Sequence, residues 1–166
     1  MFARGNRRQR IYRDRGDLEV YLALLGRAVT SCEWRCLGYC LMPNHVHLLI
    51  ESVKGNLAVG MQWFHGRYAQ WHNKRHGYSG HLFQGRYGAI RVTSDVQLWM
   101  AAAYIARNPV DARLCERPEE WMWSRYAAML GVVPSPSWLD VERLLGYFAT
   151  AGGDARRRFA DLTISS

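Results

Sequence analysis

Two histidines separated by one residue, His45 and His47, lie within an apolar run of the sequence. Side chains alternate between the two faces of a β-strand, so both imidazoles would point to one face while Val46 points to the other. Imidazole is a common ligand for metal ions in proteins. The pair therefore predicts half of a metal site, although two polar residues on the solvent face of an edge strand would have the same spacing.

Tyr104 and Asn108 form a second pair of residues whose side chains could take part in catalysis. They are four residues apart in a stretch predicted to be helical, so they are neighbours on one helix face. A tyrosine hydroxyl is a possible nucleophile, and a carboxamide oxygen is a possible metal ligand. A packed tyrosine and an asparagine that caps the helix before Pro109 would explain the same residues, so the local sequence leaves both interpretations open.

Arginine dominates the basic residues of a chain whose formal net charge is +8. Six arginines fall within the first fifteen residues: Arg4, Arg7, Arg8, Arg10, Arg13 and Arg15. Gly5 and Asn6 interrupt the series and favour a loop. The planar guanidinium group forms forked contacts with phosphate, so we expect an arm that contacts nucleic-acid phosphates. A solvated terminus is the alternative, and GC-rich coding also produces an arginine excess.

Residues 77–88 form a glycine-rich segment that combines Arg86 with three aromatic residues. Arginine alternating with aromatic rings suits stacking on nucleic-acid bases. Packing of the same rings onto the edge of the domain is an equally good explanation.

The elements that must position these residues follow from the spacing of apolar residues. Helices are predicted at 17–30, 57–76 and 94–108, the last opened by a capping box at Ser94 and ended by Pro109. Strands are predicted at 33–42, 45–52 and 89–92, the first two joined by a Pro43–Asn44 turn. Further helices are expected from 116 and over 138–148, before a break at Gly152–Gly153. Antiparallel strands with helices packed on them predict an α+β fold.

The chain has 166 residues, of which 49% are hydrophobic, so one domain with a sizeable core is expected. The sequence lacks an apolar run as long as a membrane span and a recognisable secretory signal, which predicts a soluble intracellular protein. The four cysteines are interpreted as reduced core thiols. His65, His72, His76 and His81 have no ligand-like partners at useful spacing, so none of them is assigned to a metal.

Five blocks of sequence together resemble one protein family. They are residues 4–9 (RGNRRQ), 42–49 (MPNHVHLL), 80–87 (GHLFQGRY), 104–110 (YIARNPV) and 116–126 (ERPEEWMWSRY). In this order they are similar to the REP-associated tyrosine transposases, a group within the single-tyrosine HUH (IS200-like) transposases. Only Met1, Phe2 and Ala3 precede the first block, where members of this family carry a β-strand.

The resemblance implies a ferredoxin-like antiparallel sheet of four to five strands flanked by helices, with extra C-terminal helices. Residues 1–131 would form the transposase domain, and residues 132–166 a helical extension packed on it or tethered to it. The implied location is the bacterial cytoplasm, in association with the nucleoid and without a membrane partner. Both a homodimer and a monomer fit the family.

The resemblance also implies an enzyme, an endonuclease and DNA strand transferase active in transposition. It would cleave and rejoin single-stranded or hairpin DNA, such as hairpins of repetitive extragenic palindromes (REP), through a 5′-phosphotyrosine intermediate. His45, His47 and Asn108 match the ligands of a divalent Mg²⁺ or Mn²⁺ ion, and Tyr104 matches the nucleophile. The residues expected to contact DNA are Arg4, Asn6, Arg7, Arg8 and Arg86.

Two other functions are weighed against this one. A domesticated protein that binds hairpin DNA with little or no cleavage is the first alternative. A different histidine-based phosphodiesterase or hydrolase is the second, but a histidine-triad enzyme would need a third alternating histidine where Leu49 stands. The presence of all the presumed catalytic residues favours the enzyme.

Overall fold

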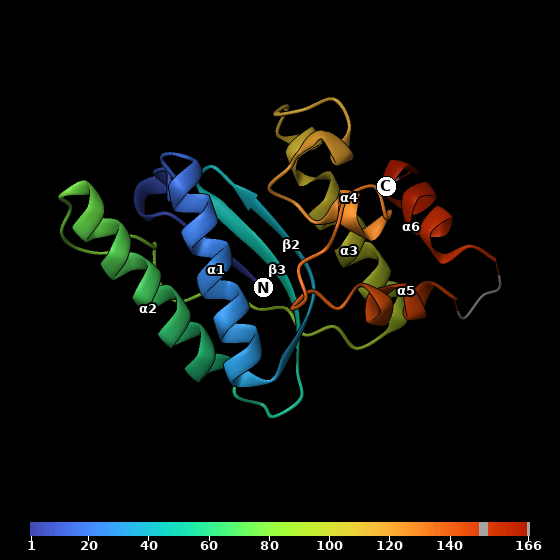
Figure 1. The fold of residues 1–166 in the computed structure, drawn as a ribbon, viewed down its shortest axis with the longest axis horizontal. Helices are drawn as coiled ribbons and strands as arrows, with labels where there is room; N and C mark the ends of the chain where they lie inside the picture. Colours follow the sequence, from blue (N-terminus) through green and yellow to red (C-terminus); the bar gives the residue numbers. More distant parts are fainter. Residues whose placement is uncertain (150–152, 166) are drawn as a thin grey trace.

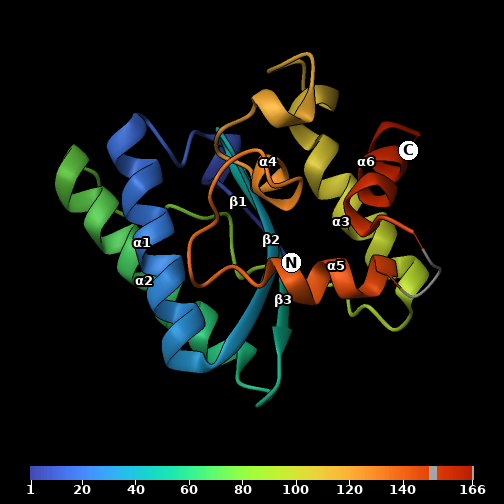
Figure 2. The same ribbon diagram turned by 45° about the vertical axis from the view of Figure 1, so that its right-hand side comes forward.

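A three-stranded antiparallel sheet lies at the centre of the computed structural model, which describes residues 1–149 and 153–165. The strands are β1 (Phe2–Arg4), β2 (Trp34–Met42) and β3 (His45–Ser52), and their order in the sheet is β1-β3-β2. Helices cover the sheet from both sides, as Figures 1 and 2 show. The predicted α+β class is confirmed.

The β2–β3 hairpin matches its predicted bounds closely. Met42 pairs with His45 next to the Pro43–Asn44 turn, and Trp34 pairs with Ser52 at the other end. On one face of β3 the side chains of Val46 and Leu48 are buried, whereas His45 and His47 on the other face are half-buried. The alternation expected from the sequence therefore does separate the two imidazoles from the core face.

The expected count of four to five strands is wrong for the described residues, which contain three. Residues 89–92 form no strand: Ile90 is 80% exposed, and Val92 alone in this stretch packs partly against the core. The preceding segment 83–88 instead runs beside β1 and the residue after it, through isolated bridges between Phe2 and Gly88 and between Gly5 and Phe83. The short strand β1 lies at one edge of the sheet.

Helices α1 (Arg15–Cys32) and α2 (Leu57–His76) pack against each other, and α1 packs on β2. Asp14 caps α1, because its carboxylate accepts a hydrogen bond from the Asp17 backbone amide. Tyr21 of α1 and Tyr68 of α2 are fully buried, with their ring centroids 4.9 Å apart. This aromatic contact holds the two helices together on one side of the sheet (Figure 2).

Helix α3 (Asp95–Asp111) packs against β2 and β3. The Ser94 hydroxyl accepts a hydrogen bond from the Gln97 amide, which confirms the predicted N-cap. The predicted end at Asn108 is wrong, because α3 continues through Pro109. Proline cannot donate to the carbonyl one turn earlier, but the amides of Ala112 and Leu114 bond the carbonyls of Asn108 and Pro109 and close another turn.

The chain after α3 is folded into shorter pieces than predicted. A 3₁₀ helix, η2 (Pro118–Glu120), stands where a longer helix was expected from residue 116. The Glu120 carboxylate accepts hydrogen bonds from the amides of Glu116 and Arg117, which closes a compact turn instead of extending a helix. Helix α4 (Tyr126–Met129) follows.

Two further helices, α5 (Val141–Ala149) and α6 (Ala155–Ser165), pack on α3 and on each other. The Phe148 ring contacts Trp99 of α3 and Phe159 of α6. The break predicted at Gly152–Gly153 falls partly outside the described residues, since residue 152 is not among them. Among the described helices, none combines the length and apolar character that crossing a membrane requires.

Candidate active site and nucleic-acid interface

The residues that the sequence singled out on β3 and α3 lie together. The His45 Nε2 atom is 3.0 Å from the carboxamide oxygen of Asn108. The ring of His47 is edge-on to the ring of Tyr104, with centroids 5.3 Å apart, and the rings of His45 and His47 are 5.0 Å apart. Two imidazoles, a carboxamide and a phenol thus meet between a strand and a helix.

The two elements bring these side chains together for simple geometric reasons. His45 and His47 point from β3 toward α3, which packs on that face of the sheet. Tyr104 and Asn108 are one helical turn apart, so both face β3. Asn108 is buried, whereas Tyr104 is 54% exposed. The phenol is therefore open to a large substrate, while the amide is held in place beside the histidines.

The neighbours of His45 decide which of its nitrogens carries a proton. The Asn44 side-chain amide donates to the Arg8 carbonyl at 3.2 Å, which turns the Asn44 carboxamide oxygen toward His45 Nδ1 at 2.8 Å. An oxygen can only accept there, so Nδ1 carries the proton and Nε2 presents a lone pair. This lone pair faces the Asn108 oxygen, which is another acceptor. Two acceptors 3.0 Å apart suit a shared cation.

Burial favours the neutral, ligand form of both imidazoles. Burial lowers the pKa of His45 from its usual value; Arg4 acts in the same direction, and the hydrogen bond that only the protonated ring could donate to the Asn108 oxygen opposes it. Burial, aided by the nearby charges of His45, the N-terminus and Arg4, lowers the pKa of His47 to about 4. Neither histidine needs to lose a proton near neutral pH before it binds a metal ion.

The donor set fits the divalent ion that the resemblance implies. His45, His47 and Asn108 offer two nitrogen atoms and one amide oxygen from one side, which leaves coordination positions for water and for a phosphate oxygen. Such a mixed set accepts Mg²⁺ or Mn²⁺, and it also accepts later transition ions.

The N-terminal arginines lie at the edge of this site. Arg4 pairs directly with His45 across the β1–β3 ladder, and opposite residues of an antiparallel pair point to the same face. Asn6 to Arg8 form a 3₁₀ turn, η1, in which Arg7 and Arg8 adopt positive φ angles of 51° and 59°. Arg4, Arg7 and Arg8 are all exposed, whereas Asn6 is half-buried.

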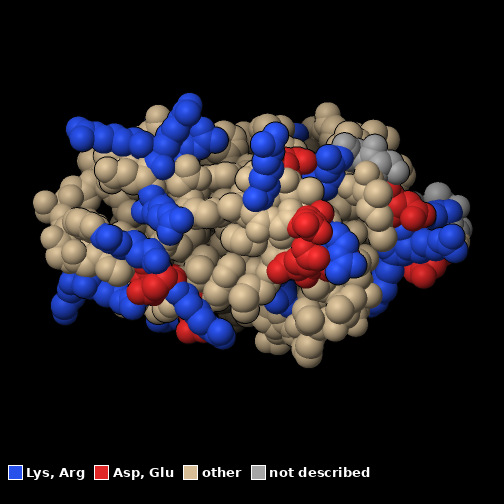
Figure 3. Space-filling model, turned by 90° about the horizontal axis from the view of Figure 1, so that it is seen from above, with Lys and Arg blue, Asp and Glu red and all other residues tan. Residues whose placement is uncertain are grey.

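Arg86 belongs to the same neighbourhood, because segment 83–88 runs beside β1. The Asn6 amide donates to the Leu82 carbonyl at 2.8 Å, and the Gln84 amide donates to the Arg4 carbonyl at 2.9 Å. Arg86 itself is exposed. All five residues expected to contact DNA thus lie on two adjoining segments. Figure 3 shows that Lys and Arg prevail over acidic side chains on one broad face of the molecule.

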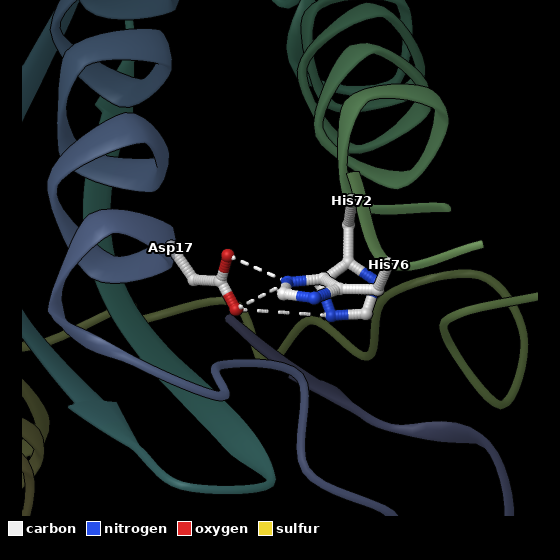
Figure 4. A group of neighbouring side chains, drawn as sticks. All are labelled: Asp17, His72 and His76. Atoms are coloured by element: carbon white, nitrogen blue, oxygen red, sulfur yellow. Dashed lines mark hydrogen bonds and ion pairs between the residues drawn. The ribbon is translucent and has the colours of Figure 1, made fainter. Parts of the chain in front are cut away.

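A second group of potential metal ligands was missed from the sequence. Asp17, His72 and His76 each place a ligand atom within 4.8 Å of the others (Figure 4). The statement that His72 and His76 have no ligand-like partner is therefore wrong. The available signal was the spacing of the two histidines, which are four residues apart on α2 and share a helix face. Asp17 comes from α1, and no sequence pattern around it predicts that it would lie beside the two histidines.

The other two histidines remain outside both groups. His65 is stacked on Phe83, with ring centroids 4.4 Å apart, and its Nε2 lies 3.1 Å from the Tyr21 hydroxyl. His81 is exposed.

Comparison with known proteins points to one family. A family model described as "Transposase IS200 like" matches residues 1–108. A solved structure, described as that of the "REP associates tyrosine transposase bound to a REP hairpin", is similar with a TM-score of 0.61. The similarity covers 84% of this chain and 86% of that chain at 17% sequence identity, which shows a shared fold. A search of curated proteins found no match.

Proposed function

We propose that this chain, which belongs to the IS200-like transposase family, is a metal-dependent DNA strand transferase. It cleaves and rejoins structured single-stranded DNA, such as REP-like hairpins, through a 5′-phosphotyrosine intermediate. The observation that carries the proposal is the meeting of Tyr104 with His45, His47 and Asn108 at one place. The hairpin bound by the structurally similar transposase supports the choice of substrate.

Tyr104 is the proposed nucleophile. Its hydroxyl oxygen attacks the scissile phosphorus, the bond from phosphorus to the 3′ oxygen breaks, and that oxygen leaves as a free 3′-hydroxyl. The 5′ phosphate stays on the tyrosine, so the energy of the phosphodiester bond is kept in the covalent link. A second 3′-hydroxyl attacks this link in the reverse sense, and rejoining needs no ATP.

His45, His47 and Asn108 would hold a Mg²⁺ or Mn²⁺ ion. When bound, the ion supplies Lewis-acid polarisation of the phosphate and neutralises its developing charge. The protein's own part is to keep both imidazoles neutral and to hold Asn108 one turn from the nucleophile. Because all four side chains come from one chain, a single copy contains the whole set, which supports a monomer that is competent by itself.

The arm of residues 4–8 and Arg86 would hold the DNA. Exposed guanidinium groups on two adjoining segments can follow the phosphates at the foot of a hairpin. Arg4 lies opposite His45 in the ladder, which supports a role in binding a phosphate near the proposed metal ion.

The proposal is tested by incubating the protein with a library of single-stranded hairpins and Mn²⁺, and resolving covalent adducts on a denaturing gel. A hairpin-dependent adduct that disappears with EDTA is the expected result. Tight hairpin binding without any adduct or cleaved strand would instead favour a protein that binds hairpins and no longer cuts them.

A further inference from the structure

The group of Asp17, His72 and His76 lies on the other side of the sheet from Tyr104. His45 and His47 point to α3, whereas α1 and α2 lie on the opposite side (Figures 1 and 2). The group forms where the first turn of α1 meets the last turn of α2 (Figure 4). It is therefore spatially separate from the proposed catalytic residues.

The arrangement of the three side chains leaves one of them, among the described residues, without a hydrogen-bond partner. His76 Nε2 donates to both carboxylate oxygens of Asp17, at 3.0 and 3.1 Å. His72 Nε2 lies 4.0 Å from Asp17 Oδ2, too far for a hydrogen bond. His72 is only 1% exposed, and within the described residues neither of its ring nitrogens has a hydrogen-bond partner. Buried polar groups are normally satisfied, so the unpartnered imidazole beside a carboxylate indicates a missing ligand.

We propose that Asp17, His72 and His76 bind a late first-row transition-metal ion, with Zn²⁺ as the best fit. Two imidazole nitrogens and one carboxylate oxygen are typical zinc ligands and leave a fourth position for water. His72 and His76, one helical turn apart, supply both nitrogens from α2, and Asp17 supplies the oxygen from α1. His76 is partly exposed, which gives an ion a path from solvent.

The charges around the site allow a divalent ion. The Arg75 guanidinium lies 2.5 Å from Asp17 Oδ1 and also pairs with both oxygens of Asp14. The carboxylates of Asp14 and Asp17 and the Arg75 guanidinium together carry a charge of −1, and the Arg13 guanidinium, which also acts on His72, brings the surroundings close to neutral before an ion arrives. Arg75 occupies Oδ1, and the Arg13 backbone amide donates to Oδ2 at 2.7 Å. These contacts orient the carboxylate as neighbours of metal ligands usually do.

Binding requires one proton to move. In the arrangement described, His76 Nε2 carries the proton that it donates to Asp17. Nε2 must present a lone pair to the ion, so the proton is transferred through solvent to Nδ1, and the imidazole stays neutral. The bonds from Nε2 to Asp17 are replaced by bonds from Nε2 and Asp17 to the ion.

A bound ion would link α1 to α2 close to residues 11–13, which connect the N-terminal arm to α1. The Arg13 amide already bonds Asp17, and Tyr68 of α2 donates to the Ile11 carbonyl at 2.6 Å. An ion shared by α1 and α2 would hold this part of the chain more firmly, close to η1 and its arginines.

The test uses the full-length chain carrying His45→Ala and His47→Ala, which removes the proposed catalytic ligands. After treatment with chelator and desalting, Zn²⁺ is titrated in by calorimetry, and Mg²⁺ serves as a separate titrant. We expect one equivalent of bound Zn²⁺, no binding of Mg²⁺, and a rise in Tm of roughly 5–10 °C at a hundredfold excess over Kd. Adding His76→Gln should weaken Zn²⁺ binding at least 100-fold, whereas adding His81→Gln, at an exposed histidine outside both groups, should not.

Crystals of the same double variant soaked in Zn²⁺ provide a readout that does not depend on the folding of the His76→Gln variant. An anomalous difference peak between Asp17, His72 and His76 is expected. Absence of Zn²⁺ binding, affinity unchanged by His76→Gln, or a peak only elsewhere would overturn the proposal. None of these results measures DNA cleavage, so the proposed zinc site and the proposed function are tested independently of each other.

Discussion

His45 Nε2 lies 3.0 Å from the carboxamide oxygen of Asn108, a residue 63 positions further along the chain. The hydrogen bond between His45 and Asn44 leaves this nitrogen with a lone pair, so two acceptors face each other. The contact is understandable if a cation is shared between them. It connects the strand with the histidine pair to the helix that carries Tyr104, and the predictions on DNA cleavage depend on it.

Changing Tyr104 to Phe should abolish the covalent DNA adduct and leave hairpin affinity within about twofold. The change removes only a hydroxyl from a side chain that is 54% exposed, so stability should shift by less than about 0.5 kcal/mol. Peptide mapping of a trapped wild-type adduct by mass spectrometry should place the DNA on Tyr104. Tyr126 is 4% exposed and unsuited to reach DNA, so an adduct there, or on Tyr87, contradicts the assignment.

Changing either His45 or His47 to Ala should lower the rate of hairpin cleavage at least 100-fold while sparing hairpin binding. Loss of a metal that neutralises charge on the phosphate removes several kcal/mol of transition-state stabilisation, which corresponds to this factor or more. EDTA should have the same effect on the wild type, and added Mn²⁺ should restore only the wild type. Full cleavage in the presence of EDTA would contradict the requirement for a metal ion and the proposed role of Asn108 as a ligand.

Changing Arg4, Arg7 and Arg8 together to Ala should weaken hairpin binding and flatten its salt dependence. Each single-strand phosphate neutralised adds roughly 0.7 to the log–log slope, so losing three contacts should reduce the slope by about 2. The matched control changes Arg27, Arg67 and Arg157, which are exposed on helices α1, α2 and α6. Equal losses in the two triple variants, measured by fluorescence anisotropy over a salt series, would show a general charge effect.

Changing Gly5 to Ala should destabilise the arm. A Cβ at this position would lie 2.1 Å from the Gln9 carbonyl oxygen and 2.9 Å from the Ile11 side chain, so the backbone of η1 would have to shift. We expect a loss of about 1–3 kcal/mol in the free energy of unfolding together with weaker hairpin binding. Gly66→Ala in α2 is the control, because its Cβ would meet nothing within 4 Å, and it should stabilise the helix by about 0.5–1 kcal/mol. Urea unfolding of both variants gives the comparison, and similar effects would contradict the steric argument.

Acid should destabilise the fold partly through His65. Burial lowers the pKa of His65 to about 4, whereas an unfolded histidine titrates near 6.5. The unfolded chain therefore binds the proton first, and stability falls as the pH decreases from about 6.5 to about 4, by up to about 3 kcal/mol. His65→Gln keeps an acceptor for the Tyr21 hydroxyl but does not titrate. Urea unfolding between pH 7 and 4.5 should show a smaller loss for this variant than for wild type and His81→Gln, and parallel curves would contradict the role of His65.

Local sequence was sufficient for the parts of the site that lie within one element. The alternation of apolar and polar residues in 45–52 placed His45 and His47 on one face of a strand. The four-residue spacing of Tyr104 and Asn108 placed both on one face of a helix. These relations depend only on the repeat of the backbone, so they do not change with the surroundings.

Tertiary structure decided how the elements meet. Whether α3 brings Asn108 to His45 depends on packing between residues distant in sequence. Local preference would have ended α3 at Asn108, whereas backbone hydrogen bonds from Ala112 and Leu114 close a further turn beyond Pro109. The apolar residues at 89–92 predict a strand, yet in the described structure this stretch is not paired with β1, and Ile90 is exposed. The group of Asp17, His72 and His76 became visible only when α1 met α2. A repeat within one element fixes which side chains share a face, but only the burial of apolar surface between elements decides which faces come together.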